Sequence, residues 1–213
     1  MRVALVTGVV VAALSVPGAA GADDAACPGA DTTIAADTVA ASADAIVCLL
    51  DVWRAGVNEV ALVRSSQLDL SSDSHSRDMV ARHYLAHQRR DGPSVLDRIR
   101  ASGYFDNALD GIYSENIGVV PQETATARAL VSAWLSSPDH RDNIEEAAFR
   151  NIGVGIAFAP PDRAFYPDYA SVVVTTDFGQ RTLRPRPRRH AVRCSRKHKP
   201  RRARPYCRRK HTS

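Results

Sequence analysis

The 213-residue sequence lacks the short motifs that mark several large classes of enzyme. It has no Gly-x-Ser-x-Gly nucleophile elbow, no glycine-rich phosphate loop and no His-Glu-x-x-His helix. These motifs build sites for a serine nucleophile, a nucleotide phosphate and a zinc ion, respectively. The sequence also has no Cys-x-x-Cys pair, which argues against a redox dithiol and against a structural zinc held by cysteine.

Long apolar runs are also missing, except at the N-terminus. There an apolar run over residues 3–16 follows Arg2 and precedes the small residues Ala20-Gly21-Ala22. This pattern predicts a signal peptide over residues 1–22. The run is short for a bilayer span, and an uncleaved N-terminal anchor is the alternative interpretation. We therefore expect a secreted, extracellular protein, either free or associated with the cell surface, with no transmembrane segment after cleavage.

Cysteine is scarce, with four residues that lie near the two ends of the chain. An even number of cysteines in an exported protein indicates disulfide bonds, and four cysteines allow three pairings. The pairs that are local in sequence, Cys27–Cys48 and Cys194–Cys207, are the favoured ones. The first bridge would tie the segment over residues 23–43 to the first helix and contribute on the order of 3 kcal/mol.

Basic residues are few in the body of the chain and dense at its end. Residues 1–180 hold 13 Lys and Arg and 23 Asp and Glu, a formal charge of −10. Residues 181–213 hold 15 Lys and Arg and no acid, a formal charge of +15, and contain all three lysines. This segment is interrupted by prolines and has few aliphatic residues, so it is expected to be a mostly disordered tail.

The tail is expected to bind anionic polymers through its charge. Outside a cell these are wall polymers, lipid headgroups and extracellular DNA. Tyr206 is the one aromatic residue in the tail, so stacking on nucleic acid bases is poorly supported.

Hydrophobic periodicity predicts helices first and then helices mixed with strands. The expected helices cover residues 44–63, 68–86, 94–103 and 123–136, with a further helical turn from Ser137-Pro138. Ser94 and Asp97 form an acidic variant of the capping box at the start of the third helix. Strict alternation predicts strands at residues 151–158 and 169–178, joined as an antiparallel hairpin, with a third strand at 112–120. The pattern is that of an α+β domain with a small antiparallel sheet.

Three short sequence segments, the islands, carry the residues that could catalyse a reaction or bind a ligand. They are Tyr84-Leu85-Ala86-His87, Ser114-Glu115-Asn116-Ile117 and the run from Trp134 to Arg141, which contains His140. Two imidazoles and a carboxylate could form a polar site or hold a divalent metal such as zinc, with water completing the coordination. Alternatively, Glu115 holds the cleft together by accepting hydrogen bonds from the histidines, and His87 is a solvated turn residue.

Other polar residues near the islands have simpler interpretations. His83 lies four residues before His87 but is expected to flank the site or to be solvated. His75 lies on the inward stripe of its helix and is expected to be a hydrogen-bonded core histidine. Ser137 is a helix N-cap rather than a nucleophile, and Asn116 caps or bridges backbone groups. His140 falls near the third position of its helical turn, where the helix dipole favours the neutral imidazole.

The order and spacing of the islands resemble the CAP superfamily, also called the SCP domain, in its secreted bacterial branch. The superfamily includes cysteine-rich secretory proteins, antigen 5 and plant pathogenesis-related 1 proteins. The resemblance covers about residues 45–180. The matching residues are His75-Ser76-Arg77-Asp78-Met79, Tyr84-Leu85-Ala86-His87, Asp97-Arg98-Ile99, Gly103-Tyr104, Glu115-Asn116-Ile117, the run from Ala133 to Ile144, residues 149–155, and Thr175-Thr176-Asp177-Phe178-Gly179.

The resemblance implies an α-β-α sandwich with a surface cleft over residues 44–180. The family's two cleft histidines and its acid map to His87, His140 and Glu115, and in some members these residues bind a divalent metal. The sequence departs from the family at Leu135-Ser136-Ser137, where many eukaryotic members carry a second glutamate. It departs again at Ser114, where a glycine is common, and at Asp51, where an asparagine is usual.

These observations favour a secreted CAP-domain protein that acts as an extracellular binding or interaction module. Its cleft would bind a divalent cation or a small ligand. The alternative is a metal-assisted hydrolase that acts on peptide or cell-wall material, with Glu115 or a histidine as general base. The family has been linked both to protease-like activity and to lipid binding, so the resemblance leaves the question of an enzyme open.

Overall fold

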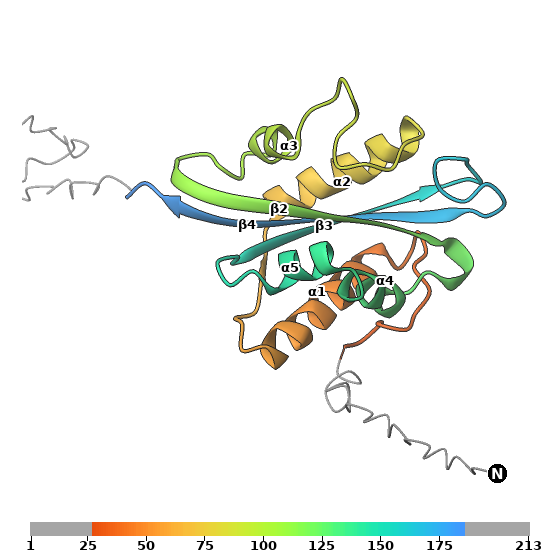
Figure 1. Cartoon of the computed structure of the whole chain (residues 1–213), viewed down its shortest axis with the longest axis horizontal. Helices are drawn as coiled ribbons and strands as arrows, with labels where there is room; N and C mark the ends of the chain where they lie inside the picture. Colours follow the sequence, from red (N-terminus) through yellow and green to blue (C-terminus); the bar gives the residue numbers. More distant parts are fainter. Residues whose placement is uncertain (1–26, 186–213) are drawn as a thin grey trace, which may run out of the picture.

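The computed structural model describes residues 27–185 as a four-stranded sheet between two layers of helices (Figure 1). One face of the sheet is covered by α1 (Val39–Gly56), α4 (Ala127–Leu135) and α5 (Pro138–Glu145). The other face is covered by α2 (Ser66–Ala81) and α3 (Val95–Ala101). The structure thus confirms the α-β-α sandwich. The predicted signal peptide, most of the basic tail and the Cys194–Cys207 pair lie outside the described residues.

The strands are β1 (Val63–Arg64), β2 (Ala108–Pro121), β3 (Asn151–Ala159) and β4 (Ser171–Leu183), in the spatial order β1-β3-β4-β2. β3 and β4 form the predicted antiparallel hairpin, and β2 pairs antiparallel with β4 along its whole length. The sheet is nevertheless mixed, because β1 pairs parallel with β3. Two residues are too few for an alternation pattern, so no local pattern indicates β1.

Several helix ends differ from the predicted ones. α1 covers Val39–Gly56 rather than residues 44–63, and Asn58 beyond it has a positive φ of 63°. α2 ends at Ala81 rather than at residue 86, because His83 adopts the left-handed conformation with φ 57°. α4 begins at Ala127 rather than near residue 123, since the Thr126 hydroxyl accepts a hydrogen bond from the Ala129 N–H at 3.1 Å. The preceding residues form a separate 3₁₀ turn, η2 (Gln122–Thr124).

Apolar side chains fill both sides of the sheet. Beneath the α1 side, the fully or almost fully buried residues include Ile46, Leu50, Leu130, Trp134, Ile152 and Phe178. On the α2 side they are Leu68, Met79, Ile99, Tyr104 and Val173. Each large apolar side chain buried in this way contributes about 1.5–3 kcal/mol. No helix among residues 27–185 combines the length and the apolar character that a membrane crossing requires.

Two glycines bring α2 unusually close to the sheet. A Cβ atom at Gly153 would lie 2.0 Å from the Leu68 carbonyl carbon, and one at Gly155 would lie 2.2 Å from the Asp73 nitrogen. The Ser76 hydroxyl, on the same face of α2, donates a hydrogen bond to the Gly155 carbonyl at 3.0 Å. The helix backbone therefore rests directly on β3, which fixes the position of every side chain that α2 carries.

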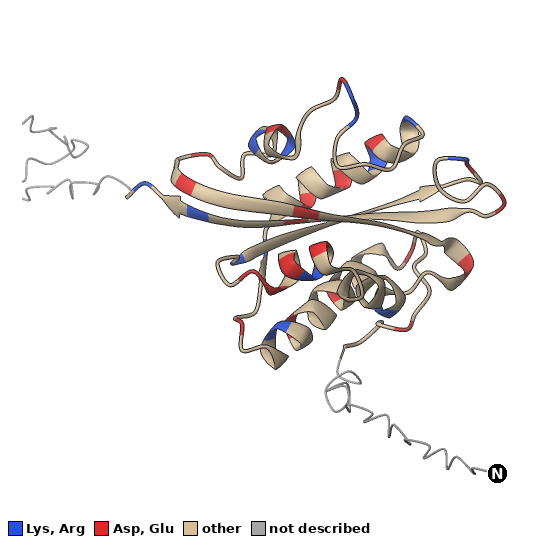
Figure 2. Cartoon of the chain, in the orientation of Figure 1, with Lys and Arg blue, Asp and Glu red and all other residues tan. Residues whose placement is uncertain are grey.

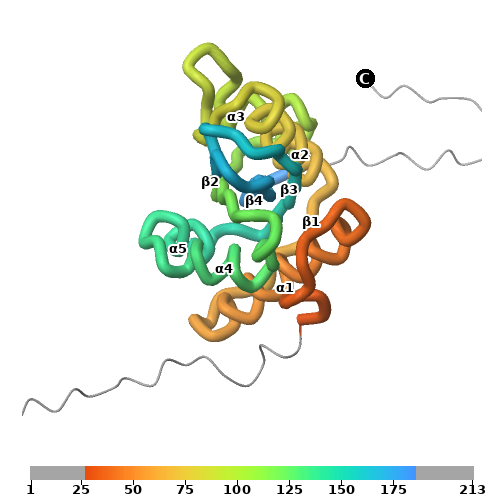
Figure 3. Tube along the Cα trace, turned by 90° about the vertical axis from the view of Figure 1, so that its right-hand side faces the viewer, coloured from red at the N-terminus to blue at the C-terminus, as the bar shows by residue number. Residues whose placement is uncertain are grey.

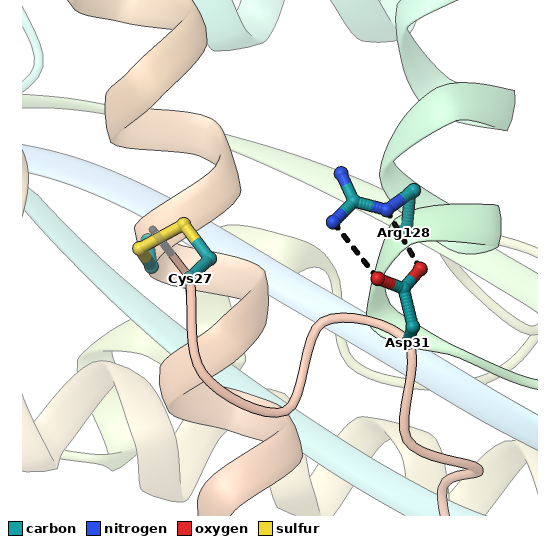
Figure 4. The surroundings of a disulfide bond; sticks show 4 residues. Cys27, Asp31 and Arg128 are labelled. Carbon is teal, nitrogen blue, oxygen red and sulfur yellow. Dashed lines mark hydrogen bonds and ion pairs between the residues drawn. A yellow bond between two sulfur atoms is a disulfide. The ribbon is translucent and has the colours of Figure 1, made fainter. Parts of the chain in front are cut away.

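The N-terminal segment is held to the domain by one disulfide and one ion pair (Figure 4). Cys27 is bonded to Cys48 in α1 with a Cα–Cα distance of 5.7 Å, as favoured from the sequence. Asp31 accepts hydrogen bonds from the Arg128 guanidinium at 2.7 and 3.0 Å, which ties the same segment to α4. The segment before α1 is thus anchored to two helices.

Candidate functional site

His87 lies in the connection between α2 and α3, above the edge strand β2. Its Nδ1 atom is 2.8 Å from the Oε1 atom of Glu115, which is in the middle of β2. The His87 side chain is 53% exposed, whereas that of Glu115 is 1% exposed. A buried carboxylate therefore fixes one nitrogen of an imidazole whose ring reaches the solvent.

The second oxygen of Glu115 is also occupied. Arg98 of α3 donates a hydrogen bond from Nη2 to Glu115 Oε2. Its Nη1 donates to two backbone carbonyls of the connection, those of His87 at 3.0 Å and Pro93 at 3.1 Å. Because the Arg98 side chain is only 6% exposed, this arginine joins Glu115 to the backbone of His87 in one buried network.

His75 supports the same network from α2. Its side chain is 1% exposed, and its Nε2 atom lies 3.1 Å from the Ala86 carbonyl and 3.7 Å from Glu115 Oε1. Burial lowers the pKa of His75 although the charge of Glu115 acts in the opposite direction. A neutral His75 therefore carries its proton on Nε2 and donates it to Ala86, which confirms the prediction of a hydrogen-bonded core histidine.

His140 approaches β2 from the opposite face of the sheet. It is the third residue of α5, which begins after the N-cap Ser137. The Asn116 amide donates a hydrogen bond to the His140 carbonyl at 3.0 Å, and the Asn143 amide donates to Asn116 Oδ1 at 2.8 Å. Asn116 thus bridges backbone groups as predicted. Neighbouring residues on a strand point to opposite faces. Glu115 therefore contacts His87 on one face, while Asn116 binds the backbone of α5 on the other.

The two histidines approach β2 from opposite faces of the sheet. Figure 3 shows β2 at one edge, with α5 on one side of the sheet and the α2–α3 layer on the other. Burial lowers the pKa of His140, and the charge of a protonated His87 lowers it further. The Nδ1 atom of His140 is buried and has no hydrogen-bond partner within residues 27–185. One ring nitrogen of His140 is therefore left without a hydrogen bond from the described residues.

The two elements that carry His87 and His140 differ in charge. The α2–α3 connection carries basic residues, among them Arg89 and Arg90. Helix α5 carries the acids Asp139, Asp142 and Glu145 (Figure 2). A ligand in the cleft would thus lie between a basic loop and an acidic helix.

Residues weighed as alternatives lie elsewhere or have structural roles. His83 is 66% exposed and pairs with Asp162 in the β3–β4 connection. Ser136 donates its hydroxyl to the Ser132 carbonyl at 2.8 Å. Ser137 is the N-cap residue of α5, although its side chain makes no capping hydrogen bond. The structure pairs neither serine with a histidine among the described residues, so no nucleophile–base pair is formed there.

Sequence reasoning overlooked one buried acid, Asp177. It lies opposite Glu115 in the β2–β4 pairing and has no exposed surface. Its carboxyl oxygens make no hydrogen bond of good geometry with residues 27–185. Burial, followed by the nearby charge of Glu115, raises the pKa of Asp177 to about 7, against the weaker effects of Arg98 and of the Ser71 and Ser72 hydroxyls.

The raised pKa of Asp177 predicts a fall in stability as the pH rises. Its folded-state pKa lies above the value of about 3.9 for an exposed Asp, so the folded protein binds the additional proton between these values. The free energy of unfolding should decrease from pH 4 to pH 7 through this group. Asp177→Asn should flatten this slope and be more stable than wild type at pH 8, measured by urea unfolding.

The lowered pKa values of His75 and His140 change stability with pH in the opposite direction in both proteins. The difference between the pH slopes of wild type and variant therefore gives the effect of Asp177. Equal pH slopes for the two proteins would contradict the prediction.

The hydrogen bonds of Glu115 limit which side chains could bind a metal ion. Both Glu115 oxygens are engaged, one by His87 and one by Arg98, so Glu115 stands behind His87 as an orienting carboxylate. Residues 27–185 contain no group of three or more His, Cys, Asp or Glu side chains arranged to hold a metal ion. The donors that fit a divalent cation are the two imidazoles, with the remaining positions open to water or a ligand. Whether His87, Glu115 and His140 bind a metal together stays a prediction.

Arg98 was also missed as part of the site. The sequence placed it in the motif Asp97-Arg98-Ile99 and gave it no role. The available signal was its position after the capping box of α3, where Ser94 and Asp97 bond reciprocally. That position fixes Arg98 on the first turn of the helix, but its partners come from other segments.

The comparisons with known proteins agree with this fold. A family model for CAP, the cysteine-rich secretory protein family, matches residues 48–177. The chain is 30% identical over 124 residues to the uncharacterized protein YkwD of Bacillus subtilis, covering 58% of this chain and 46% of YkwD.

Two solved structures of bacterial proteins match the chain. An extracellular SCP-domain protein from Bacillus anthracis matches with a TM-score of 0.51 and 22% identity, covering 68% of this chain and 43% of that chain. An outer surface protein from Borrelia burgdorferi matches with a TM-score of 0.49 and 18% identity, covering 64% and 90%, respectively. The chain thus spans less than half the length of YkwD and of the Bacillus anthracis protein. The family model covers more than half of the sequence, and the chain belongs to the CAP, or cysteine-rich secretory protein, family.

Proposed function

We propose that this CAP-domain protein is an extracellular binding module whose cleft holds a divalent cation between His87 and His140. The N-terminal export pattern and the Cys27–Cys48 disulfide support an extracellular site of action. The Bacillus anthracis relative is described as an extracellular protein. The basic residues after position 180 would hold the protein to anionic polymers outside the cell.

The observations that carry the proposal are the unsatisfied Nδ1 atom of His140 and the oriented ring of His87, whose charge acts on His140. A buried polar atom without a partner costs free energy, which a bound ion or a water molecule that the ion holds can recover. The lowered pKa of His140 keeps it neutral, the form that binds metal. Glu115 fixes His87 through Nδ1, so the Nε2 atom is left to face a ligand.

Zinc titration calorimetry on the purified protein tests the proposal. The wild type should bind one zinc ion more tightly than His87→Ala or His140→Ala by at least about 10–100-fold, as for changes around known metal sites. The matched control is His83→Ala, which removes an exposed imidazole outside the cleft and should leave this binding unchanged. The three tail histidines, at positions 190, 198 and 211, are present in every variant and so cancel in the comparison.

The same variants distinguish the rival function. Each protein is assayed with and without zinc on a broad panel of peptides and cell-wall glycans. Zinc-dependent turnover that is lost in both cleft variants but kept in His83→Ala would replace the binding module with a metal-assisted hydrolase. Equal zinc affinity in all four proteins would reject the cleft as a metal site.

A further inference from the structure

A second concave site lies where β4 ends, and none of its lining residues belongs to the histidine cleft. It is a cavity of about 580 Å³, lined in part by Gln67, Asp106, Asn107, Arg181 and Arg184. Figure 1 places this end of β4 at the opposite end of the sheet from the β3–β4 connection. Its volume falls within the range of about 300–1,000 Å³ that is usual for small-molecule sites.

Arg181 is held rigidly in this pocket. Its guanidinium donates a hydrogen bond to the Tyr104 carbonyl and lies 4.3 Å from the centre of the Tyr104 ring. Tyr104 is itself fully buried, and its hydroxyl donates to Asn151 at 2.8 Å. A cation fixed in this way loses little conformational freedom when an anion binds.

Arg184 supplies a second guanidinium, at the point where the described chain leaves the sheet. Its backbone N–H donates a hydrogen bond to the Asn107 carbonyl at 2.9 Å, which anchors this part of the pocket wall. Neither Arg181 nor Arg184 forms an ion pair with a carboxylate of residues 27–185. Two guanidinium groups without ionic partners suit a phosphate group, which arginine can bind through two parallel hydrogen bonds.

The other polar groups in the lining suit hydroxyls rather than a second anion. Asp106 offers carboxylate oxygens that accept hydrogen bonds, and Gln67 and Asn107 offer amides that both donate and accept. The lining contains no aromatic side chain on which a nucleobase could stack. A phosphate that carries a small polyol therefore matches the pocket better than a nucleotide does.

We propose that this pocket binds a glycerol phosphate unit, with the phosphate on Arg181 and Arg184 and the polyol hydroxyls on Asp106 and the amides. Residues 186–213 follow the pocket directly in sequence and hold 13 further Lys and Arg. A polymer of glycerol phosphate units and a lipid surface that presents them are two sources of this unit outside a cell. The pocket would then add selectivity for one unit to the general charge attraction of the tail.

Binding of sn-glycerol 3-phosphate to the full chain, followed by NMR titration, tests the proposal. Arg181→Gln and Arg184→Gln should each weaken binding about tenfold, the usual scale for one charge-assisted hydrogen bond. Arg163→Gln is the matched control, because it removes an exposed arginine from the β3–β4 connection at the other end of the sheet. Asp106→Asn should weaken glycerol phosphate but leave inorganic phosphate binding unchanged or stronger.

Because Arg181 also packs on Tyr104, Arg181→Gln tests the fold as well as the pocket. Arg184 is exposed, so its variant tests the pocket alone. Oligomeric poly(glycerol phosphate) and vesicles of phosphatidylglycerol, compared with phosphatidylcholine, distinguish a wall polymer from a lipid headgroup as the source. Glycerol phosphate binding that is absent at millimolar concentration, or that falls equally in Arg184→Gln and Arg163→Gln, would overturn the proposal.

Discussion

Gly155→Ala should destabilise the protein by about 3 kcal/mol or more, at the upper end of the cost of overpacking a core. The new Cβ atom would lie 2.2 Å from backbone atoms of Ser72 and Asp73 in α2. Backbone atoms cannot turn aside as the end of a flexible side chain can, so α2 as a whole must move away from β3. The hydrogen bond from Ser76 to the Gly155 carbonyl would lengthen with it.

The displacement should also reach the cleft. α2 carries His75, whose ring supports the Ala86 carbonyl next to His87. We therefore expect weaker zinc binding as well as a lower urea midpoint in Gly155→Ala. The control is Gly56→Ala at the end of α1, where a Cβ atom would meet nothing within 4 Å. It should change stability by less than about 1 kcal/mol, in the stabilising direction. A Gly155→Ala protein as stable as Gly56→Ala would contradict the packing described.

Arg98→Gln should cost about 3–5 kcal/mol, the scale for breaking a buried ion pair by removing one partner. The substitution leaves Glu115 as a buried carboxylate without its cation, and it removes two hydrogen bonds to the His87 and Pro93 carbonyls. The backbone of residues 87–93 then loses its attachment to α3. The domain should therefore be less stable, and the His87 side chain should be less firmly oriented.

Three measurements check this prediction. Urea unfolding gives the loss of stability, and amide hydrogen exchange should show faster exchange confined at first to residues 86–94. Arg98→Lys should recover part of the stability but not the slow exchange, because lysine cannot bind two carbonyls and a carboxylate in a fixed fork. Arg100→Gln is the matched control, since Arg100 is an exposed arginine on the same helix. If the two glutamine variants were equally stable, the buried network would not contribute as described.

Local signals predicted most of the secondary structure. Alternation of residue types identified β3 and β4, although the structure buries both faces of these strands rather than one. The capping box at Ser94 and Asp97 marked the start of α3, and both of its hydrogen bonds are present. These features depend on neighbouring residues, which is why the sequence alone could indicate them.

Features that depend on distant contacts were less predictable. The helical period of α2 continues in the sequence to Ala86, but the positive φ of His83 ends the helix five residues earlier. The two-residue strand β1 exists only because β3 lies beside it. In the same way, the burial of Arg98 and Asp177 follows from partners on other elements and leaves no local pattern.

The candidate site illustrates the same division. The family pattern identified His87, Glu115 and His140, and the structure brings His87 onto Glu115 and places His140 across the same strand. The pattern did not indicate that Arg98 occupies the second oxygen of Glu115. That contact changes the expected donor set from two imidazoles and a carboxylate to the two imidazoles alone.

The most direct test is an anomalous difference map from crystals soaked in zinc and measured at the zinc absorption edge. The account predicts one peak in the cleft, about 2.0–2.1 Å from a ring nitrogen of both His87 and His140. Glu115 should remain bonded to His87 and Arg98 in that crystal. A peak bound directly by the Glu115 oxygens, or zinc found at His83 and Asp162 with none in the cleft, would contradict it.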